Sequence, residues 1–377
     1  MKILNIHDYP PKEGGGVEVN TYEVSKVLAA LGNDVTIATS RLSSETVSNK
    51  EQTDLSDKVR TIHLKKVSQL KELIELSDVV HIHFTFSFRP ASMLGLKLCA
   101  ELNKPCVFSF RTVYGHVAFS AVYTDSHLEQ DRKFGELKQY LASPNVHLSG
   151  PSKSVNETLK RLGINKKVTV IRNGCTALVP KVSSFLDVKK ANLTYIGELS
   201  FLKGINYLID AMAIVVKSKP RCLLRLIGGG SDELAMRRLV SYYNLEDNVE
   251  FVGYVPNNCI PSYLAKTDVY VHPSLTESWG NSVVEALSMG VPVICSKISG
   301  LIDATANGKF ATLVNAGDVQ DLAKSIREIL KAECLEKEKI KAVKAMKHIK
   351  KKYTFNNQAK QLDKLYKSVY SAVGQIS

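Results

Sequence analysis

Two glutamates that stand eight positions apart, Glu277 and Glu285, lie in the run PSLTESWGNSVVEAL. Residues 268–272, just before this run, are rich in β-branched and aromatic side chains, which predicts a short strand. After the run, Gly290 predicts the end of a helix, and residues 291–295 predict a buried strand. Glu277 therefore falls in a loop at the carboxyl end of a strand, where open α/β sheets bind their ligands, and Glu285 falls inside the following helix.

This arrangement suits the recognition of a sugar that is linked to phosphate. A carboxylate can accept hydrogen bonds from two hydroxyls of a sugar or a ribose at once. The backbone amides at the start of the helix, around Gly280 and Asn281, can bind a phosphate. The alternative is that both glutamates are solvated residues on a surface helix.

The same run resembles the signature of glycosyltransferase family 4. Glu-x7-Glu follows a strand that ends in Pro-Ser and precedes the sequence EALSMGVPV. Members of that family are retaining, nucleotide-sugar-dependent enzymes with the α/β GT-B fold, in which two Rossmann-like doubly wound domains face each other across a cleft. The resemblance implies that Glu285 holds the ribose hydroxyls. It implies that Glu277 holds a hydroxyl of the donor sugar and supports the oxocarbenium-like transition state, with Gly280 and Asn281 near the diphosphate.

A glycine-rich turn follows the first predicted strand. Its glycines precede Glu18 and open a predicted helix, so the backbone there can approach a ligand closely and the helix N-terminus favours an anion. By itself such a turn is more often a plain tight turn. It resembles the family's opening motif, which implies that Gly15 and Gly16 approach the donor diphosphate.

A second motif, YIGELSFLKG, begins the second half of the chain. It resembles the family's Gly-Arg-Leu-x3-Lys-Gly loop, in which the arginine and the lysine neutralise the diphosphate as the glycosidic bond breaks. Lys203 matches the lysine, but Glu198 stands at the arginine position. A carboxylate about 5 Å from a phosphate charge costs roughly 3 kcal/mol at an effective dielectric of about 20. Glu198 is therefore expected to point away, to pair with a cation or to mark a changed site.

Arg111 is the other departure from the family pattern. It follows a predicted strand where the family commonly has a histidine beside the donor sugar. Our hypothesis is that Arg111 replaces the cation lost at Glu198 and reaches the diphosphate or a charged acceptor; the alternative is an arginine bonded to Glu198 or to a surface acid. His116 is a second substitute for the missing histidine, whereas His81 and His83 are expected to be packed or hydrogen-bonded structural groups.

Three further segments resemble parts of the family that lie near the nucleotide. Gly228 and Gly230 lie in a glycine-rich turn between a predicted strand and a predicted helix, which is not a full dinucleotide motif. Val255 lies in the segment GYVP, whose backbone commonly meets the base. Asp303 falls where family members often carry glutamate, and its role stays open.

The composition fits a soluble protein of two domains, because 377 residues are long for one core. The seven cysteines include no C-x2-C pair, which argues against a zinc or redox motif and for reduced thiols in the cytoplasm. No signal peptide or membrane-spanning segment is expected, because the first residues enter a strand and no apolar run approaches roughly 20 residues. No Asp-x-Asp element ends a strand, so no metal or other cofactor is expected to be required.

Strand-like and helix-like segments alternate along the chain, which predicts mainly parallel sheets covered by helices on both faces. A stretch without clear periodicity, 174–191, separates two such series. We expect an N-terminal acceptor-binding domain at 1–175 and a nucleotide-sugar-binding domain at 176–352. By the resemblance, the helix within 353–377 crosses back to the first domain. The predicted strands are 2–6, 34–39, 59–64, 78–83, 105–110, 146–149, 167–171, 193–196, 222–227, 249–252, 268–272, 291–295 and 312–314.

Much of the net charge of +13 comes from residues 331–352, which hold nine lysines and three glutamates. Three interpretations remain open: a solvated surface helix, attraction to an anionic membrane that carries a lipid-linked acceptor, and nucleic-acid binding, which no interleaved aromatic residues support. The apolar residues of this segment predict one stripe along a helix with a basic face, and they are Leu335, Ile340, Val343, Met346 and Ile349.

Together these features predict a retaining hexosyl- or related glycosyltransferase that moves a sugar from a UDP- or GDP-sugar to a hydroxyl. The expected acceptor is a growing polysaccharide or a lipid-linked glycan, contacted by loops 84–89 and 112–127. Glu277, Lys203 and Arg111 are the predicted catalytic residues. The expected location is the cytoplasm, or the inner face of the membrane, and nucleic acid is not an expected partner. The alternative function is a degenerate, non-catalytic GT-B module that binds nucleotide or glycan.

Overall fold

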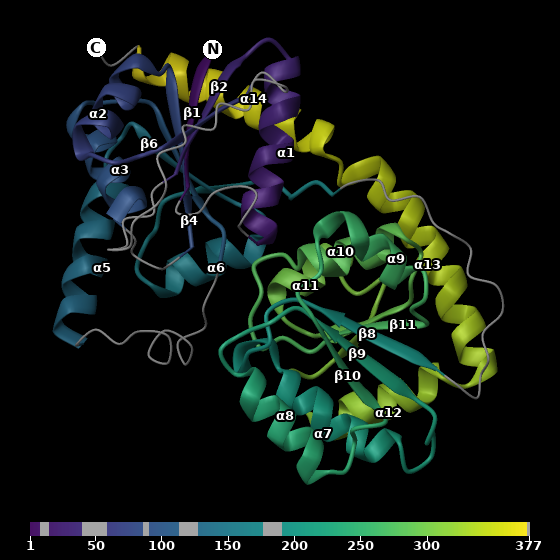
Figure 1. Cartoon of the computed structure of the whole chain (residues 1–377). Coiled ribbons are helices and arrows are strands. Elements are labelled where there is room, and N and C mark those ends of the chain that lie inside the picture. Colours follow the sequence, from purple (N-terminus) through teal and green to yellow (C-terminus); the bar gives the residue numbers. More distant parts are fainter. Residues whose placement is uncertain (8–14, 40–58, 86–89, 113–126, 176–190, 375–377) are drawn as a thin grey trace. The chain divides into compact units, whose positions relative to one another are not determined.

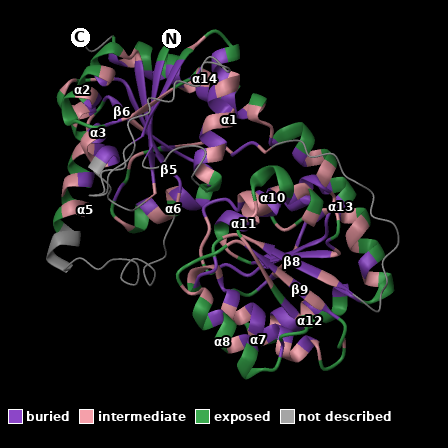
Figure 2. Ribbon diagram, viewed as in Figure 1, coloured by how far each residue is buried: buried purple, intermediate pink, exposed green. Residues whose placement is uncertain are grey.

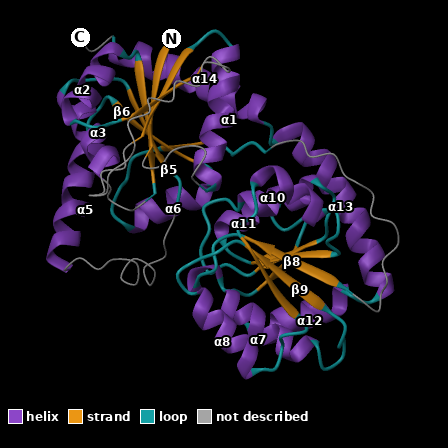
Figure 3. Cartoon of the chain, in the orientation of Figure 1, coloured by secondary structure: helices purple, strands orange, loops and turns teal. Residues whose placement is uncertain are grey.

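The chain folds into two compact units. Unit 1 comprises Met1–Gly174 and Phe355–Ser377, and unit 2 comprises Cys175–Thr354. From the sequence, the second domain was expected at 176–352, so its start and its end differ from those of unit 2 by one and two residues. Each unit is a sheet with helices on both faces (Figures 1 and 3). The computed structural model describes residues 1–7, 15–39, 59–85, 90–112, 127–175 and 191–374.

Unit 1 is built on a seven-stranded sheet in the order β3-β2-β1-β4-β5-β6-β7, and all of its described pairings are parallel. Its strands lie within one or two residues of the predicted ones. They are β1 (Lys2–His7), β2 (Asp34–Thr39), β3 (Val59–His63), β4 (Val79–Phe84), β5 (Cys106–Phe110), β6 (Val146–Gly150) and β7 (Val168–Val170). The helices are α1 (Gly16–Ala30), α2 (Val67–Leu76), α3 (Pro90–Glu101), α5 (His127–Leu141), α6 (Lys153–Arg161) and α14 (Phe355–Val373).

The sheet of unit 1 is buried on both faces, as parallel sheets usually are (Figure 2). One apolar cluster joins the strands to α1 and α14, with Leu28 and Leu362 among its buried residues. The other cluster joins the strands to α2, α3, α5 and α6, with Leu70 and Leu137 among its buried residues. The last helix of the chain is therefore part of the core of unit 1.

Unit 2 repeats this plan with a six-stranded parallel sheet in the order β10-β9-β8-β11-β12-β13. Its strands are β8 (Asn192–Ile196), β9 (Leu223–Ile227), β10 (Val249–Gly253), β11 (Val269–His272), β12 (Val293–Ser296) and β13 (Thr312–Val314). Its α-helices are α7 (Ile205–Val215), α8 (Glu233–Tyr242), α9 (Ile260–Leu264), α10 (Asn281–Ser288), α11 (Ser299–Ala304), α12 (Val319–Ile329) and α13 (Ala332–Lys352), and its 3₁₀ turns are η2 (Phe201–Lys203) and η3 (Asn257–Cys259).

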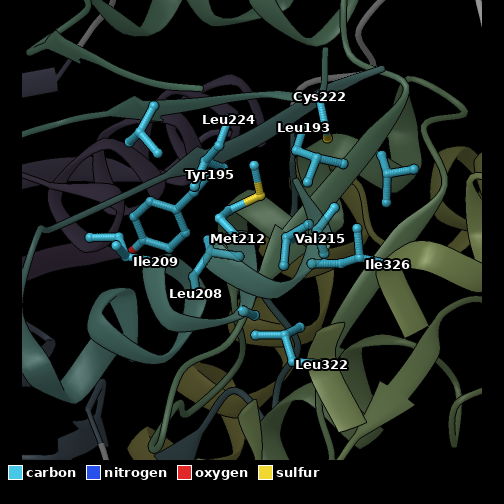
Figure 4. Close-up of a cluster of buried hydrophobic side chains, with 14 of the residues drawn as sticks. Leu193, Tyr195, Leu208, Ile209, Met212, Val215, Cys222, Leu224, Leu322 and Ile326 are labelled. Carbon is cyan, nitrogen blue, oxygen red and sulfur yellow. The ribbon is translucent and has the colours of Figure 1, made fainter. Parts of the chain in front are cut away.

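Two apolar clusters hold unit 2 together, one on each face of the sheet. Figure 4 shows part of the first, in which Met212 and Val215 of α7 pack with strand residues such as Leu193 and with Ile326 of α12. The second cluster joins the opposite face to α9, α10, α11 and the C-terminal half of α13. A large core on both sides of the sheet fixes where the strands end, and the site described below lies at those ends.

The apolar stripe predicted for residues 331–352 is wrong in part. Ile340 and Val343 are 57% and 45% exposed, whereas Leu335, Ala345 and Ile349 are buried. An α-helix turns about 100° per residue, so Ile340, nine positions before Ile349, lies on the opposite side of the helix. Ala342 and Ala345 mark the buried side, but alanine is less apolar than the exposed Ile340 and Val343, so the sequence pattern favoured the wrong side. None of the described helices has both the length and the apolar composition to span a bilayer.

The chain passes between the units twice, and the two passing segments are paired. Within unit 2, Cys175 N donates to Tyr353 O at 2.9 Å, and Cys175 forms a parallel bridge with Thr354. Within unit 1, Gly174 N donates to Gln358 Oε1 at 2.7 Å, and Gln358 is buried. Both ends of unit 2 are thus fixed by backbone hydrogen bonds.

Candidate active site

The strand order of unit 2 reverses between β8 and β11, which makes these two strands the topological switch point of the sheet. In open α/β sheets, ligands bind beyond the carboxyl ends of the strands at such a point. The loop after β8 carries Lys203, and the loop after β11 carries Glu277. The sequence predicted both residues as catalytic, and the structure brings them together.

Backbone packing sets the distance between these two loops. Gly204 has a φ of +70°, and a Cβ added to it would lie 2.1 Å from Pro273 O. Leu275 N donates to Leu202 O at 2.9 Å, which joins the loops by a main-chain hydrogen bond. Only glycine fits at position 204, because a side chain would collide with the opposite loop. This close approach places Lys203 beside the loop that carries Glu277.

Lys203 and Glu277 form an ion pair in which Nζ lies 2.5 Å from Oε1. Their side chains are 24% and 14% exposed, so the pair is largely shielded but still reaches the surface. His272 Nε2 lies 3.2 Å from the same oxygen. Burial alone would raise the pKa of Glu277, but Lys203 and His272 outweigh it and lower the pKa to about 2. Glu277 is therefore an anion at neutral pH and can only accept hydrogen bonds.

The segment after Glu277 turns into α10 through a glycine. Gly280 has a φ of +82° and is the N-cap residue of α10, so this helix begins directly after the segment that carries Glu277. Trp279 is buried in the apolar cluster below. A Cβ on Gly300 would lie 2.1 Å from Glu277 O, so the loop after β12 also packs on this segment. The start of α10, with Asn281, can therefore bind an anion next to the Lys203–Glu277 pair.

Glu285 lies about one turn into α10 and is half-buried. Burial raises its pKa to about 7, so its carboxyl group changes charge near neutral pH. Its charge contributes to raising the pKa of Cys175, after the larger effect of burial on that thiol. The second glutamate of the predicted pair is thus chemically distinct from the first.

Two more predicted residues, Gly228 and Gly230, lie in the loop after β9. A Cβ on Gly228 would lie 2.0 Å from Gly197 O, and one on Gly230 would lie 2.3 Å from Leu199 O. The glycines thus pack against the backbone of the loop after β8. In the structure, the absence of a side chain at these two positions allows the loop after β9 to pack directly on the loop after β8. Val255, which follows β10, is partly exposed.

Glu198, at the position where the family has arginine, is exposed, and its carbonyl accepts a 2.9 Å hydrogen bond from the buried Tyr195 hydroxyl. Which of the three outcomes expected for its carboxylate applies stays a prediction. Asp303 lies in α11 and is partly exposed.

The predicted residues of unit 1 lie at the start of α1 and after β5. Gly15 is the N-cap residue of α1, and Gly16 is its first residue. Arg111 is 6% exposed: Nε donates to His83 Nδ1 at 2.9 Å, and a terminal nitrogen donates to Asn173 Oδ1 at 3.0 Å. Burial lowers its pKa to about 10, opposed by Tyr366 and Glu18, so it remains a cation. His116 and most of the loops predicted to hold the acceptor lie outside the described residues.

A buried polar network surrounds Arg111. His81 bonds to the Tyr366 hydroxyl and to Ser109 at 2.6 Å each, and His83 bonds to Asn5 at 3.1 Å. Burial, together with Arg111 and the neighbouring histidines, lowers the pKa of both histidines well below its usual value, so they are neutral. The two histidines are hydrogen-bonded groups within the sheet.

His272 is the residue of this site that the sequence did not single out. It is the last residue of β11 and lies two positions before Ser274 of the Pro-Ser motif. A polar ring at the end of an otherwise apolar strand, next to an acid five residues on, is the signal that could have found it.

Two family models match the chain, one for each half. The model described as Glycosyltransferase Family 4 matches residues 14–176, and the model described as Glycosyl transferases group 1 matches residues 181–348. The chain belongs to glycosyltransferase family 4. It is therefore a glycosyltransferase that uses a nucleotide-sugar donor, as its sequence predicted.

Curated relatives of this family 4 chain carry several different acceptor specificities in their names. The phosphatidylinositol N-acetylglucosaminyltransferase gpi3 subunit of Schizosaccharomyces pombe is 26% identical over 78% of this chain and 62% of its own length. Glycogen synthase of Mycobacterium tuberculosis is 25% identical over 88% of this chain and 86% of its own length. The chain thus spans less than two thirds of the first relative and most of the second.

Solved structures share the fold of the whole chain. Sucrose-phosphate synthase from Thermosynechococcus elongatus has a TM-score of 0.77 with 21% identity, over 98% of this chain and 99% of that one. HepE from Anabaena, in complex with UDP and glucose, has a TM-score of 0.76 with 18% identity, over 98% and 100%. These likenesses confirm the predicted two-domain GT-B fold.

Proposed function

We propose that this family 4 glycosyltransferase transfers a sugar from a nucleoside diphosphate to a hydroxyl with retention of the anomeric configuration, and that unit 2 binds the donor at the β8–β11 switch point. The observation that carries this proposal is the Lys203–Glu277 ion pair, held at 2.5 Å between the two loops that flank that point. A sugar diphosphate needs a cation for its phosphates and an acceptor for its hydroxyls. The ammonium of Lys203 and the carboxylate of Glu277 provide both groups beside the start of α10.

Each group of the site has a chemical role in this reaction. The bond between sugar C1 and the diphosphate oxygen breaks, and negative charge collects on the leaving diphosphate. The acceptor oxygen forms the new bond to C1, and the proton of its hydroxyl passes to the leaving diphosphate. The ammonium of Lys203 and the first amides of α10 stabilise that charge. The Glu277 carboxylate accepts a sugar hydroxyl and stabilises positive charge near C1, and Glu285 accepts the ribose hydroxyls. The roles of Gly15 and Gly16 stay predictions of the family resemblance. The role of Arg111, which departs from the family pattern, stays our hypothesis.

The donor base is best tested as uridine first. HepE, which shares the fold, has been solved in complex with UDP and with UDP-glucose. We therefore propose a UDP-sugar as the donor, with GDP-sugars as the alternative. Release of the nucleoside diphosphate from a panel of UDP- and GDP-sugars measures donor turnover without knowledge of the acceptor.

The test compares the wild-type chain with Glu277→Ala and Lys203→Met in that assay. Wild type should release nucleoside diphosphate from at least one donor, and both variants should lose most of that turnover. Glu277→Ala should still bind the free nucleotide, because Glu277 contacts the sugar. Full turnover in Glu277→Ala would refute the proposed role. Nucleotide binding without turnover by wild type would favour the non-catalytic GT-B module, which the exposed Glu198 in place of arginine supports.

We further propose that the acceptor is linked to a lipid and that the protein meets an anionic membrane through α13. The names of relatives support the first part, since one acts on phosphatidylinositol and the solved WaaG takes part in lipopolysaccharide biosynthesis. The outward face of α13 supports the second part. Ile340 and Val343 are exposed there, one turn apart, and Lys344 and Lys347 lie beside them. Apolar residues among lysines are typical of helices that bind the surface of anionic bilayers.

Co-sedimentation with phosphatidylcholine vesicles, with and without phosphatidylglycerol, tests this contact. Wild type should bind the anionic vesicles only, and Lys344→Glu/Lys347→Glu should weaken binding, by ~5-fold for each lysine removed from the surface. Ile340→Ser/Val343→Ser should weaken it without a change in charge. Lys217→Glu/Lys324→Glu, a pair of exposed lysines outside α13, is the matched control. Binding that tracks total charge in both lysine pairs, or that favours duplex DNA over vesicles, would contradict the proposal.

A further inference from the structure

The structure places His272 where it can control the carboxylate of Glu277. Three groups contact its ring nitrogens: Nε2 lies 3.2 Å from Glu277 Oε1 and 3.1 Å from Ser274 Oγ, and Nδ1 lies 3.3 Å from the Tyr270 hydroxyl. We propose that His272 is a positioning residue for glycosyl transfer, which orients the Glu277 carboxylate and keeps it ionised while the donor is bound. This inference rests on the role proposed above for Glu277.

The ring of His272 is held in one place by its surroundings. It is 2% exposed and stacks on Tyr195 and Tyr270, at centroid distances of 5.6 and 6.0 Å and an interplanar angle of 18° to each. The two tyrosines belong to β8 and β11, the strands that flank the switch point. The imidazole is thus fixed to the sheet itself, whereas Glu277 lies on a loop and Lys203 lies at the end of a flexible stem.

The proton positions follow from the groups that surround the ring. Glu277 is ionised and can only accept, so Nε2 must carry a proton to bond with Oε1. The Tyr270 hydroxyl lies 3.2 Å from Ile196 O and 3.3 Å from Nδ1. It can donate to Nδ1 of a neutral ring, or donate to Ile196 O and accept from Nδ1 of a charged ring. In both states His272 presents an N–H to Glu277.

The two donors to Glu277 reach the same oxygen. Within the described part of the chain, Lys203 Nζ and His272 Nε2 both contact Oε1. Oε2 is therefore the oxygen that remains for a hydroxyl of the donor sugar. A carboxylate held at one oxygen by two donors has a defined plane, which is what a directional bond to substrate needs.

Binding of the donor changes this balance, because the diphosphate is a second anion for Lys203. As Lys203 turns toward the phosphates, its bond to Glu277 weakens, and His272 becomes the main donor to Oε1. The histidine cannot follow the lysine, since it is buried and stacks on two tyrosines of the sheet. Its contribution is therefore largest in the donor complex, the state in which Glu277 acts.

Two substitutions separate positioning from packing. His272→Phe keeps a ring stacked on Tyr195 and Tyr270 but removes both nitrogens, and His272→Gln keeps an N–H near the place of Nε2. With the nucleotide sugar that wild type turns over fastest, His272→Phe should lower kcat ~10- to 100-fold, the usual effect of a lost hydrogen bond to a charged group. KM should change little. His272→Gln should recover most of kcat.

The pH dependence of the same reaction provides a readout that a purely structural role would not move. Without the His272 donor, the pKa of Glu277 rises, so the fall of kcat at acid pH should move to higher pH in His272→Phe and return in His272→Gln. Equal pH profiles in wild type and His272→Phe would overturn the proposal, as would a glutamine variant as impaired as the phenylalanine variant.

A second measurement does not depend on turnover, so it separates this inference from the proposed function. A double-mutant cycle of His272→Phe with Glu277→Gln, read from urea unfolding by tryptophan fluorescence, should show a coupling of ~10-fold in the unfolding equilibrium constant. Additive effects would refute the His272–Glu277 bond itself. Coupling without any donor turnover would retain the bond and refute only the glycosyltransferase role.

Discussion

The Lys203–Glu277 pair makes a quantitative prediction about stability that can be tested without a substrate. The ion pair and the His272 bond lower the pKa of Glu277 from an ordinary value of 4.5 to about 2. At 1.36 kcal/mol per pKa unit, this difference corresponds to about 3 kcal/mol of stabilisation. Because the folded-state pKa is depressed, the stabilisation is complete above pH 4.5 and is lost as the pH falls toward 2.

Glu277→Gln removes the titrating group and therefore this pH dependence. Between pH 6 and pH 3.5, wild type should lose roughly 1 kcal/mol of unfolding free energy that the variant does not lose, because at pH 3.5 the unfolded carboxyl is mostly protonated and the folded one is not. The remainder would be lost below pH 3.5. Lys203→Met should raise the pKa of Glu277 and so shrink this pH-dependent loss, because the ion pair with Lys203 lowers that pKa.

The chain supplies its own probe for this experiment. Trp279 is its single tryptophan, is 1% exposed and lies two residues after Glu277. Urea unfolding followed by tryptophan fluorescence therefore reports on unit 2 and on the neighbourhood of the pair. The reasoning would be refuted if the unfolding free energies of wild type and Glu277→Gln changed by the same amount between pH 6, 4.5 and 3.5. Glu277 would then have an ordinary pKa in the folded protein.

Three further predictions follow from individual residues. Burial raises the pKa of Glu285 to about 7, so UDP, if Glu285 accepts its ribose hydroxyls, should bind more tightly as the pH rises from 6 to 8. Calorimetric titration should show this trend in wild type and its absence in Glu285→Gln; an unchanged trend would remove Glu285 from the ribose site. Gly204→Ala should destabilise unit 2 by more than about 2 kcal/mol, because its Cβ would lie 2.1 Å from Pro273 O. Gly290→Ala, with a similar φ of +74° but no atom closer than 3.9 Å, should cost only about 1 kcal/mol, and equal losses would contradict the collision. Ile349→Ala should cost about 2–4 kcal/mol, whereas Ile340→Ala should stay within about 0.5 kcal/mol; the reverse order would restore the stripe first expected for α13.

Most of the fold could be predicted from local patterns in the sequence. Each described strand was predicted within two residues, because parallel strands buried on both faces are short apolar runs between helical segments. The placement of Glu277 after a strand and of Glu285 inside a helix was predicted for the same reason. The buried side of α13 was not predicted correctly. Alanines at 342 and 345 mark that side, whereas a hydrophobic pattern favours Ile340.

Contacts between distant residues were beyond the reach of the sequence. Lys203 and Glu277 are 74 positions apart, and both were predicted to meet a ligand rather than each other. Their pairing depends on Gly204 against Pro273, a backbone approach that no local pattern encodes. Arg111 was expected near the donor, and its contacts with His83 and Asn173 arise from strand neighbours that only the folded sheet brings together.

The paired passing segments give the molecule a modular construction. Unit 2 begins and ends within one hydrogen bond, from Cys175 N to Tyr353 O, so it is an insertion whose entry and exit sit together. Domain insertions are tolerated when the ends of the inserted body are close. Recombination at the two neighbouring crossings can therefore exchange unit 2, which carries Lys203 and Glu277, without a change in unit 1. One such unit can in this way be combined with different hosts.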